Sequence, residues 1–72
     1  MQLAEEIRVE LARQRLSVRA LADMSGVPNS TGHRIVTGQG AARINDAEAI
    51  AAALGVPLWE LIRRAEAAKT AA

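Results

Sequence analysis

The chain has 72 residues, a formal net charge of +1, one histidine and no cysteine. A chain of this length supports one small core, and its composition excludes disulfide scaffolds and thiolate zinc sites, so we expect no metal and no cofactor. The longest apolar stretch, residues 47–61, is interrupted by charged residues, glycine and proline, and the N-terminus is acidic, so we expect neither a membrane span nor a secretory signal, and a cytoplasmic location.

Arginine is concentrated in the middle of the chain. Between residues 8 and 43 there are six arginines and two acidic residues. Guanidinium groups bond phosphate oxygens and guanine edges in a paired geometry that lysine lacks. This distribution is compatible with a nucleic-acid partner and equally with the ordinary solvation of helices.

The first half of the chain predicts two helices. Residues 3–15 place apolar side chains at helical spacing. Ser17 is positioned to cap a second, short helix over residues 18–24, while Leu16 would pack against Leu21 as a hydrophobic staple.

A sharp turn and a third helix follow. Gly26 lies just past the second helix, where glycine adopts the left-handed conformation that other residues resist. Pro28 suits the first turn of a helix, which we expect to run over residues 28–36 and to stop at Gly38. Residues 38–43 are predicted to be a loop and, with two glycines and two alanines, the most flexible stretch of the chain.

The fourth and fifth helices have clear boundary signals. Asn45 is predicted to cap the fourth helix, with Glu48 completing a capping box and the helix ending at Leu54 before Gly55. A fifth helix opens at residues 56–57 and continues into a tail rich in alanine.

Five helices and no strand are therefore predicted, which makes the fold class all-α, a compact five-helix domain. We expect residues 1–66 to form the domain and residues 67–72 to be a helical extension or linker. The second and third helices with their glycine turn form a predicted helix-turn-helix over residues 17–37, a motif whose second helix lies in the major groove of DNA.

The predicted motif makes specific geometric demands. Ala22 stands where the two helices approach most closely and where a small side chain is needed, and Gly26 supplies the turn. Leu21, Val27 and Ile35 are expected to fasten the pair to the core.

A larger set of residues occurs together at the spacing of one family. It comprises Leu21-Ala22, Gly26-Val27, Ser30-Thr31, Arg34-Ile35 with Gly38, Ile50-Ala51, residues 53–56 and Glu60-Leu61. On these residues, over about residues 7–63, the chain resembles the lambda-repressor-like regulators, also called the XRE family. The resemblance implies a five-helix domain that binds double-stranded operator DNA, usually as a homodimer, and most often represses transcription, as a phage immunity repressor, an antitoxin or a small bacterial regulator.

The resemblance also implies which residues contact DNA. Bases are read from the early and exposed positions of the third helix, which here are Asn29, Ser30, His33 and Arg34. Their chemistry suits the task, since asparagine pairs with adenine and arginine with guanine through two hydrogen bonds each.

Backbone contacts are implied in the loop after the third helix, at Thr37, Gln39 and Arg43. Thr31 could add a methyl contact to thymine or a hydroxyl to phosphate. Such contacts fix the register on the duplex while the helix reads the sequence.

Two positions depart from the family pattern. Gly32 stands where relatives carry a buried isoleucine or valine, so the third helix loses a core anchor and some helix propensity. Val18 stands where many relatives have a glutamine that braces a phosphate, and Arg19 is the expected substitute for that contact.

The single aromatic residue, Trp59, is expected off the apolar face of the fifth helix. Aromatic side chains are enriched at interface centres, so Trp59 and Ile62 are candidates for a dimer interface, the alternative being a tryptophan folded onto the C-terminal tail.

Two other classes of function are alternatives to DNA binding. A protein-interaction module that keeps the fold but docks another regulator is the main alternative, and the low net charge favours it. An enzyme is not expected: Ser30 and His33 could pair as nucleophile and base, but no carboxylate nearby would orient the histidine. The sequence also leaves open a place at the start of a longer repressor.

Overall fold

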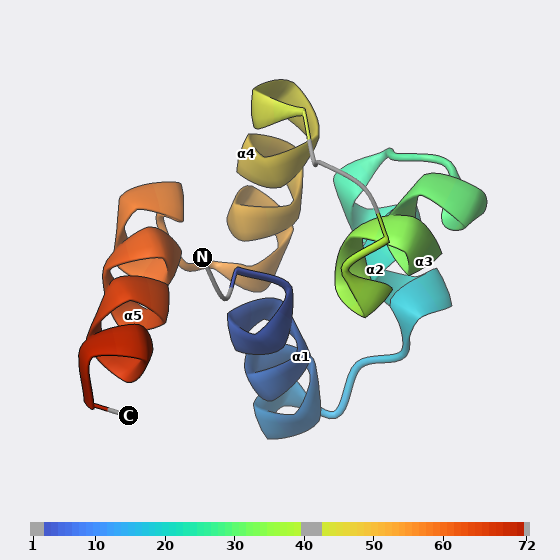
Figure 1. The fold of residues 1–72 in the computed structure, drawn as a ribbon. Helices are drawn as coiled ribbons and strands as arrows, with labels where there is room; N and C mark the ends of the chain where they lie inside the picture. The colour runs from blue at the N-terminus through green and yellow to red at the C-terminus, as the bar shows by residue number, and fades with distance from the viewer. Residues whose placement is uncertain (1–2, 40–42, 72) are drawn as a thin grey trace.

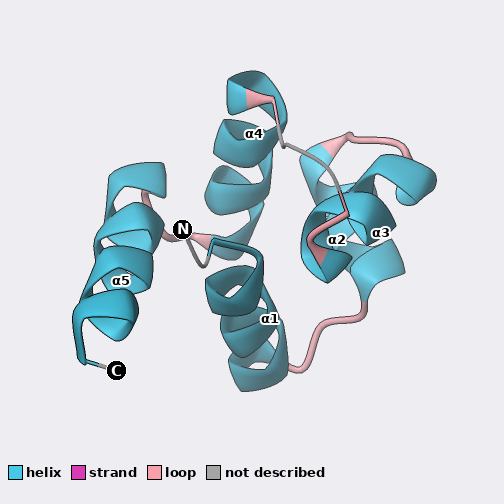
Figure 2. Cartoon of the chain, in the orientation of Figure 1, coloured by secondary structure: helices cyan, strands magenta, loops and turns pink. Residues whose placement is uncertain are grey.

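The computed structural model describes residues 3–39 and 43–71, with side chains as far as residue 68. These residues form five helices and no strand: α1 (Leu3–Gln14), α2 (Val18–Ser25), α3 (Asn29–Thr37), α4 (Ile44–Leu54) and α5 (Leu58–Ala71). The predicted all-α fold is confirmed. In Figure 1, α1 and α4 lie between α5 on one side and the α2–α3 pair on the other, and Figure 2 shows the loops that join them.

The signals predicted around α2 act as expected. The Ser17 side chain accepts a hydrogen bond from the Ala20 amide at 3.0 Å, which satisfies one of the free amides at the start of α2. At the other end Gly26 has φ +81°, and its amide bonds the Ala22 carbonyl. Leu16 packs against the core cluster that contains Leu21, in keeping with the predicted staple.

The predicted cap of α4 is wrong. The cap position is Arg43, whose backbone is extended and whose side chain makes no capping bond, and the first helical hydrogen bond joins the Ala47 amide to the Arg43 carbonyl at 2.9 Å. Asn45 therefore lies inside the first turn, too late to form a capping box with Glu48. Residues 40–42 of the predicted loop lie outside the described residues.

Other helix ends differ from the prediction by one or two residues: α2 ends at Ser25 instead of residue 24, α3 ends at Thr37 instead of residue 36, and α5 begins at Leu58 instead of residues 56–57. Pro28 precedes α3 as its cap, because its ψ of 145° is extended and the helix begins at Asn29. The predicted end of α1 at Arg15 moves to Gln14, because Arg15 has φ 56° and closes the helix in the left-handed region.

The core draws one large, fully buried side chain from each of four helices. These are Ile7 of α1, Leu21 of α2, Ile50 of α4 and Leu61 of α5. α3 contributes Ile35 and Val36, both close to its C-terminal end. The C-terminal half of α3 is therefore the part that the core holds, and its first turn projects outward.

Candidate nucleic-acid interface

α2 and α3 meet at a contact between two small residues. Ala22 is buried, and a Cβ atom built on Gly32 would lie 3.6 Å from the Ala22 Cβ. Residues this small allow two helices to approach closely. Leu21, Val27 and Ile35 are buried around this contact, where the motif requires them.

The two positions that depart from the family pattern are neighbours in space. A Cβ atom on Gly32 would lie 3.6 Å from the Val18 Cγ1. Val18 is half-buried and packs against the core. Val18 therefore covers part of the volume that a larger residue at position 32 would occupy, a compensation that the sequence does not reveal because the two residues are 14 positions apart.

α3 has one buried and one exposed face. Helical spacing places residues three and four apart on the same side, so the polar residues of this helix form a continuous row. The exposed residues are Asn29, Ser30, His33, Arg34 and Thr37, and the buried ones are Gly32, Ile35 and Val36. All four predicted base-reading residues thus lie together on the exposed face.

Thr37 was predicted to lie in the loop, but it is the last residue of α3. Its hydroxyl donates to the His33 carbonyl at 2.7 Å. A phosphate oxygen accepts hydrogen bonds. Thr37 would therefore have to give up its bond to His33 before it could donate to a DNA backbone.

A hollow of about 370 Å³ opens between α3 and the first turn of α4. It brings together one predicted base-reading residue and three predicted backbone-contact residues, which come from separate parts of the chain. Its lining is Pro28, Thr31, Arg34, Ile35, Gln39, Arg43 and Asp46. The chemistry of this hollow, two guanidinium groups beside hydroxyl and amide donors, suits a phosphate.

The charged groups at the hollow are available to a partner. Within the described part of the chain, neither Arg34 nor Arg43 is engaged in an ion pair. Asp46 is half-buried and lowers the positive charge of the hollow. Arg19 is exposed in the first turn of α2 and is not among the residues that line this hollow.

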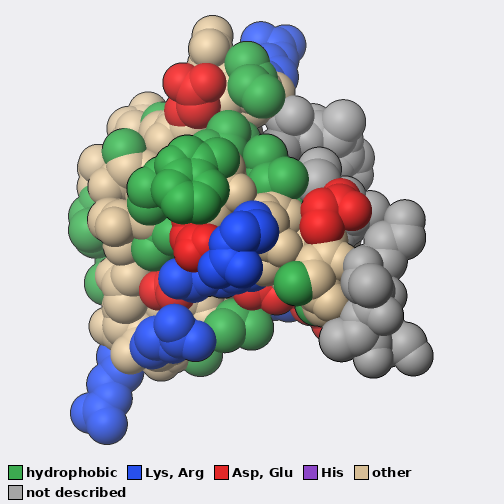
Figure 3. All heavy atoms as spheres, turned by 90° about the vertical axis from the view of Figure 1, so that its left-hand side faces the viewer, with side chains coloured by type: hydrophobic (Ala, Val, Ile, Leu, Met, Phe, Trp, Pro, Cys, Tyr) green, Lys and Arg blue, Asp and Glu red, His purple; other side chains and the backbone are tan. Residues whose placement is uncertain are grey.

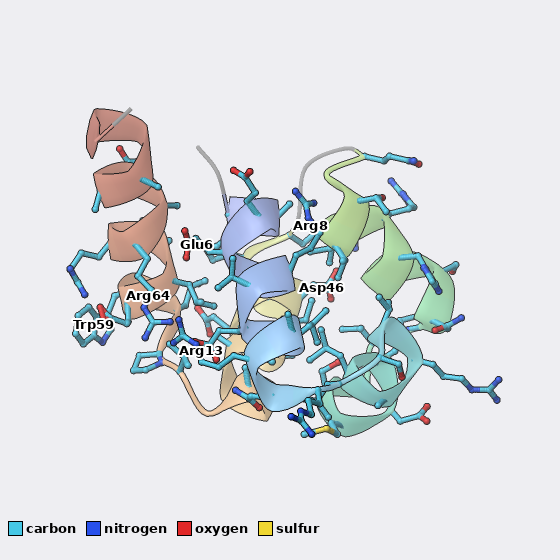
Figure 4. The ribbon with its side chains drawn as sticks, turned by 90° about the horizontal axis from the view of Figure 1, so that it is seen from below. Glu6, Arg8, Arg13, Asp46, Trp59 and Arg64 are labelled. Atoms are coloured by element: carbon cyan, nitrogen blue, oxygen red, sulfur yellow. The ribbon has the colours of Figure 1, made fainter. Side chains whose placement is uncertain are left out.

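The opposite side of the molecule carries a buried carboxylate. Glu10 of α1 is 3% exposed, and Arg64 of α5 donates to its Oε1 at 2.6 Å. Gln14 donates to its Oε2 at 3.0 Å and to the Leu54 carbonyl at 2.8 Å. In Figure 4, Arg13 and Arg64 lie close together between α1 and α5. One carboxylate thus links α1 to α5 directly and to α4 through Gln14.

The hydrogen bonds of this cluster shift the titration of its carboxylate. The bond from Gln14, followed by the bond from Arg64, holds the pKa of Glu10 below its ordinary value. The burial of Glu10 was not predictable from the sequence, because a glutamate within a helix gives no local sign of burial.

Trp59 is 66% exposed, so it is not folded onto the described part of the C-terminal helix. Figure 4 shows its side chain pointing away from the body of the molecule. Ile62, the second residue of the predicted interface, is half-buried. Figure 3 shows hydrophobic side chains gathered on this side of the molecule beside acidic and basic groups.

Comparison with known proteins identifies the family of the chain. A family model described as a helix-turn-helix domain matches residues 2–65. No curated protein and no solved structure matches the chain. Across the described ranges, no helix combines the length and the apolar character that a bilayer span requires.

Proposed function

Because the chain belongs to the helix-turn-helix domain family, we propose that it is a sequence-specific DNA-binding transcriptional regulator. The observation that carries the proposal is the exposed polar row on α3 beside the hollow lined by Arg34 and Arg43. α3 would lie in the major groove, as the second helix of this motif does. A helix that docks in a groove of another protein offers apolar anchors instead, and the exposed face of α3 has none.

Base reading is assigned to the exposed face of α3. Arg34 can donate two hydrogen bonds to a guanine, and Asn29 can exchange two with an adenine. Ser30 and His33 lie one helical turn apart on the same face and offer hydroxyl and imidazole groups to neighbouring base edges. Discrimination by each paired contact is worth about 1–3 kcal/mol.

Backbone binding is assigned to the hollow. Arg43 and Gln39 line it from the connection between α3 and α4, and Thr31 lines it from α3 itself. A phosphate seated there would fix the register of α3 in the groove. Arg19, at the start of α2, would contact a second phosphate of the DNA backbone.

We further propose repression as the regulatory outcome and a homodimer as the binding unit. The first rests on the family that the sequence resembles. The second rests on Trp59 and Ile62 of α5, a helix that takes no part in the helix-turn-helix, so that pairing there leaves α3 free for DNA. We propose no catalytic role.

Selection from a random duplex library, followed by titration of the enriched sequence at several salt concentrations, tests the proposal. An enriched two-fold motif with half-sites about one helical turn apart supports a dimeric operator binder. The double variant Asn29→Ala/Arg34→Ala should lose the enrichment while it keeps weak, salt-dependent binding. If the unmodified protein enriches no sequence, the proposal fails and the protein-interaction module is favoured.

A further inference from the structure

α3 is a weak helix by its own composition. It has nine residues, and Pro28 at its cap position provides no side-chain hydrogen bond to the first amides. Gly32 lies at its centre, and β-branched and short polar residues, which are poor helix formers, occupy most of the other positions. The order of this helix must therefore come from its neighbours.

α1 lies against the C-terminal end of α3 and bonds it through one side chain. The Arg8 guanidinium donates from Nη1 to the Val36 carbonyl at 2.5 Å. One turn earlier on α1, the Ala4 Cβ lies 3.7 Å from the position that a Cβ atom on Gly38 would occupy. Figure 4 shows Arg8 on the side of α1 away from Arg13 and Arg64, toward α3.

The Val36 carbonyl is one of the groups that a helix leaves without a partner at its C-terminal end. The two carbonyls before it have local partners. The Gln39 amide donates a hydrogen bond to the Arg34 carbonyl, and the Gly38 amide donates one to the Ile35 carbonyl. Arg8 comes from 28 positions away in the chain to bond the next one. A positive guanidinium also suits the negative end of the helix dipole.

We propose that Arg8 is a positioning residue for DNA recognition. It fastens the C-terminal end of α3 to α1, so that the exposed face of α3 is held in one orientation before DNA binds. The inference rests on the proposed function. It gives a specific role to an arginine that the sequence placed within a general basic region.

The first test uses the free protein, so that it does not depend on DNA. Arg8→Met keeps the apolar stem and removes the donors. Amide hydrogen exchange should become about tenfold faster in α3, with α4 and α5 unchanged. The control is Arg63→Met, which removes the same charge from an arginine of α5 whose side chain is 62% exposed.

Unchanged protection in α3, or an equal loss throughout the chain, would overturn the proposal. Arg8→Lys keeps the positive charge and an N–H donor. The amides of α3 should then exchange at a rate between the rates of the unmodified protein and of Arg8→Met. If Arg8→Met does not fold, the comparison of Arg8→Lys with the unmodified protein decides, because a loss of protection outside α3 contradicts the proposed role.

The second test uses the selected duplex and a random duplex. Arg8→Met should weaken binding to the selected duplex by about tenfold, because a smaller fraction of the protein holds α3 in the competent orientation. The specificity ratio should fall and the salt slope should not change. A salt slope lower by about 0.9 with an intact specificity ratio would make Arg8 a phosphate contact instead. Failure of the proposed function has a different signature, namely no selective binding by the unmodified protein.

Discussion

α1 holds its two neighbours by different means. Toward α5 it presents the buried Glu10, which accepts hydrogen bonds from Arg64 and Gln14. Toward α3 it presents Arg8, which donates a single hydrogen bond to the Val36 carbonyl. A buried carboxylate is costly to strip of its partners, whereas one bond at a helix end can break and re-form at small cost. The α5 side is thus the firm part of the scaffold, whereas on the other side the end of α3 is fastened to α1, beyond the shared apolar core, by the single bond from Arg8.

The contact between α2 and α3 fits the same division. Gly32 and Ala22 meet with little side-chain surface between them, and the first turn of α3 projects from the core. This first turn has few buried apolar contacts, so it is the part of α3 that is expected to open locally at the lowest free energy. Binding surfaces are commonly drawn from such regions, because a ligand must be able to reorganise them.

The largest expected effect is on the firm side. Glu10→Ala should lower the free energy of unfolding by about 2–4 kcal/mol, since it removes the shared partner of Arg64 and Gln14 and leaves a small void. Urea unfolding measures the loss. Glu60→Ala is the control, because its main partner, Arg63, is largely exposed and its contact with Arg64 is long at 3.8 Å, so the change should be much smaller. Equal losses of unfolding free energy for the two variants would show that the Glu10 cluster does not make the α5 side firmer.

The next effect concerns the DNA face and should leave stability unchanged. Arg34→Ala should weaken binding to the selected duplex by about 1–3 kcal/mol and relax the preference at one base position. Arg43→Ala should weaken binding to all sequences alike and lower the salt slope by about 0.9. Titrations of both variants on selected and random duplexes separate the roles. Equal losses on both duplexes for both variants would contradict the assignment.

A smaller effect is expected at the contact between α2 and α3. Gly32→Ala should raise the free energy of unfolding by up to about 1 kcal/mol, because alanine is the better helix former. The added Cβ would meet Ala22 and Val18 at 3.6 Å, an ordinary contact distance. Gly26→Ala is the control with the opposite sign, since Gly26 has φ +81°. A lower melting temperature for Gly32→Ala would show that the two helices need the glycine.

The smallest expected effect is a loss of stability at low pH. Gln14 and Arg64 lower the pKa of Glu10 from its ordinary value of 4.5 in the folded protein. The folded state therefore binds this proton less readily than the unfolded state, so its contribution is complete above about pH 4.5 and is lost as the pH falls through the folded pKa. Melting temperatures measured from about pH 6 to about pH 3 should fall less steeply for Glu10→Gln than for the unmodified protein. If the melting temperatures of the two proteins fall in parallel with pH, Glu10 does not contribute to acid sensitivity.

Helix boundaries show how far local signals reach. Ser17 and Gly26 bound α2 as predicted, because a capping hydroxyl and a left-handed glycine act on amides and carbonyls within a few residues. The start of α4 was misplaced, because Asn45 satisfies the capping rule, whereas the residue that the chain uses, Arg43, makes no side-chain capping bond. A preferred capping residue near a helix start therefore does not by itself fix the residue at which the helix begins.

The exposed face of α3 was predictable from the sequence, because helical periodicity and the polar character of Asn29, Ser30, His33 and Arg34 are properties of one short segment. The grouping of Arg34 with Arg43 around one hollow was not, because it depends on how α4 packs beside α3.

The sequence by itself determined the five helices, the helix-turn-helix and the polar row that α3 exposes. Only the tertiary structure decided that Glu10 is buried, that Arg8 holds the end of α3 and that Val18 lies beside Gly32. The physical reason is range. Propensity, capping and periodicity act over a few residues, whereas the burial of Glu10 requires a partner, Arg64, that is 54 positions away.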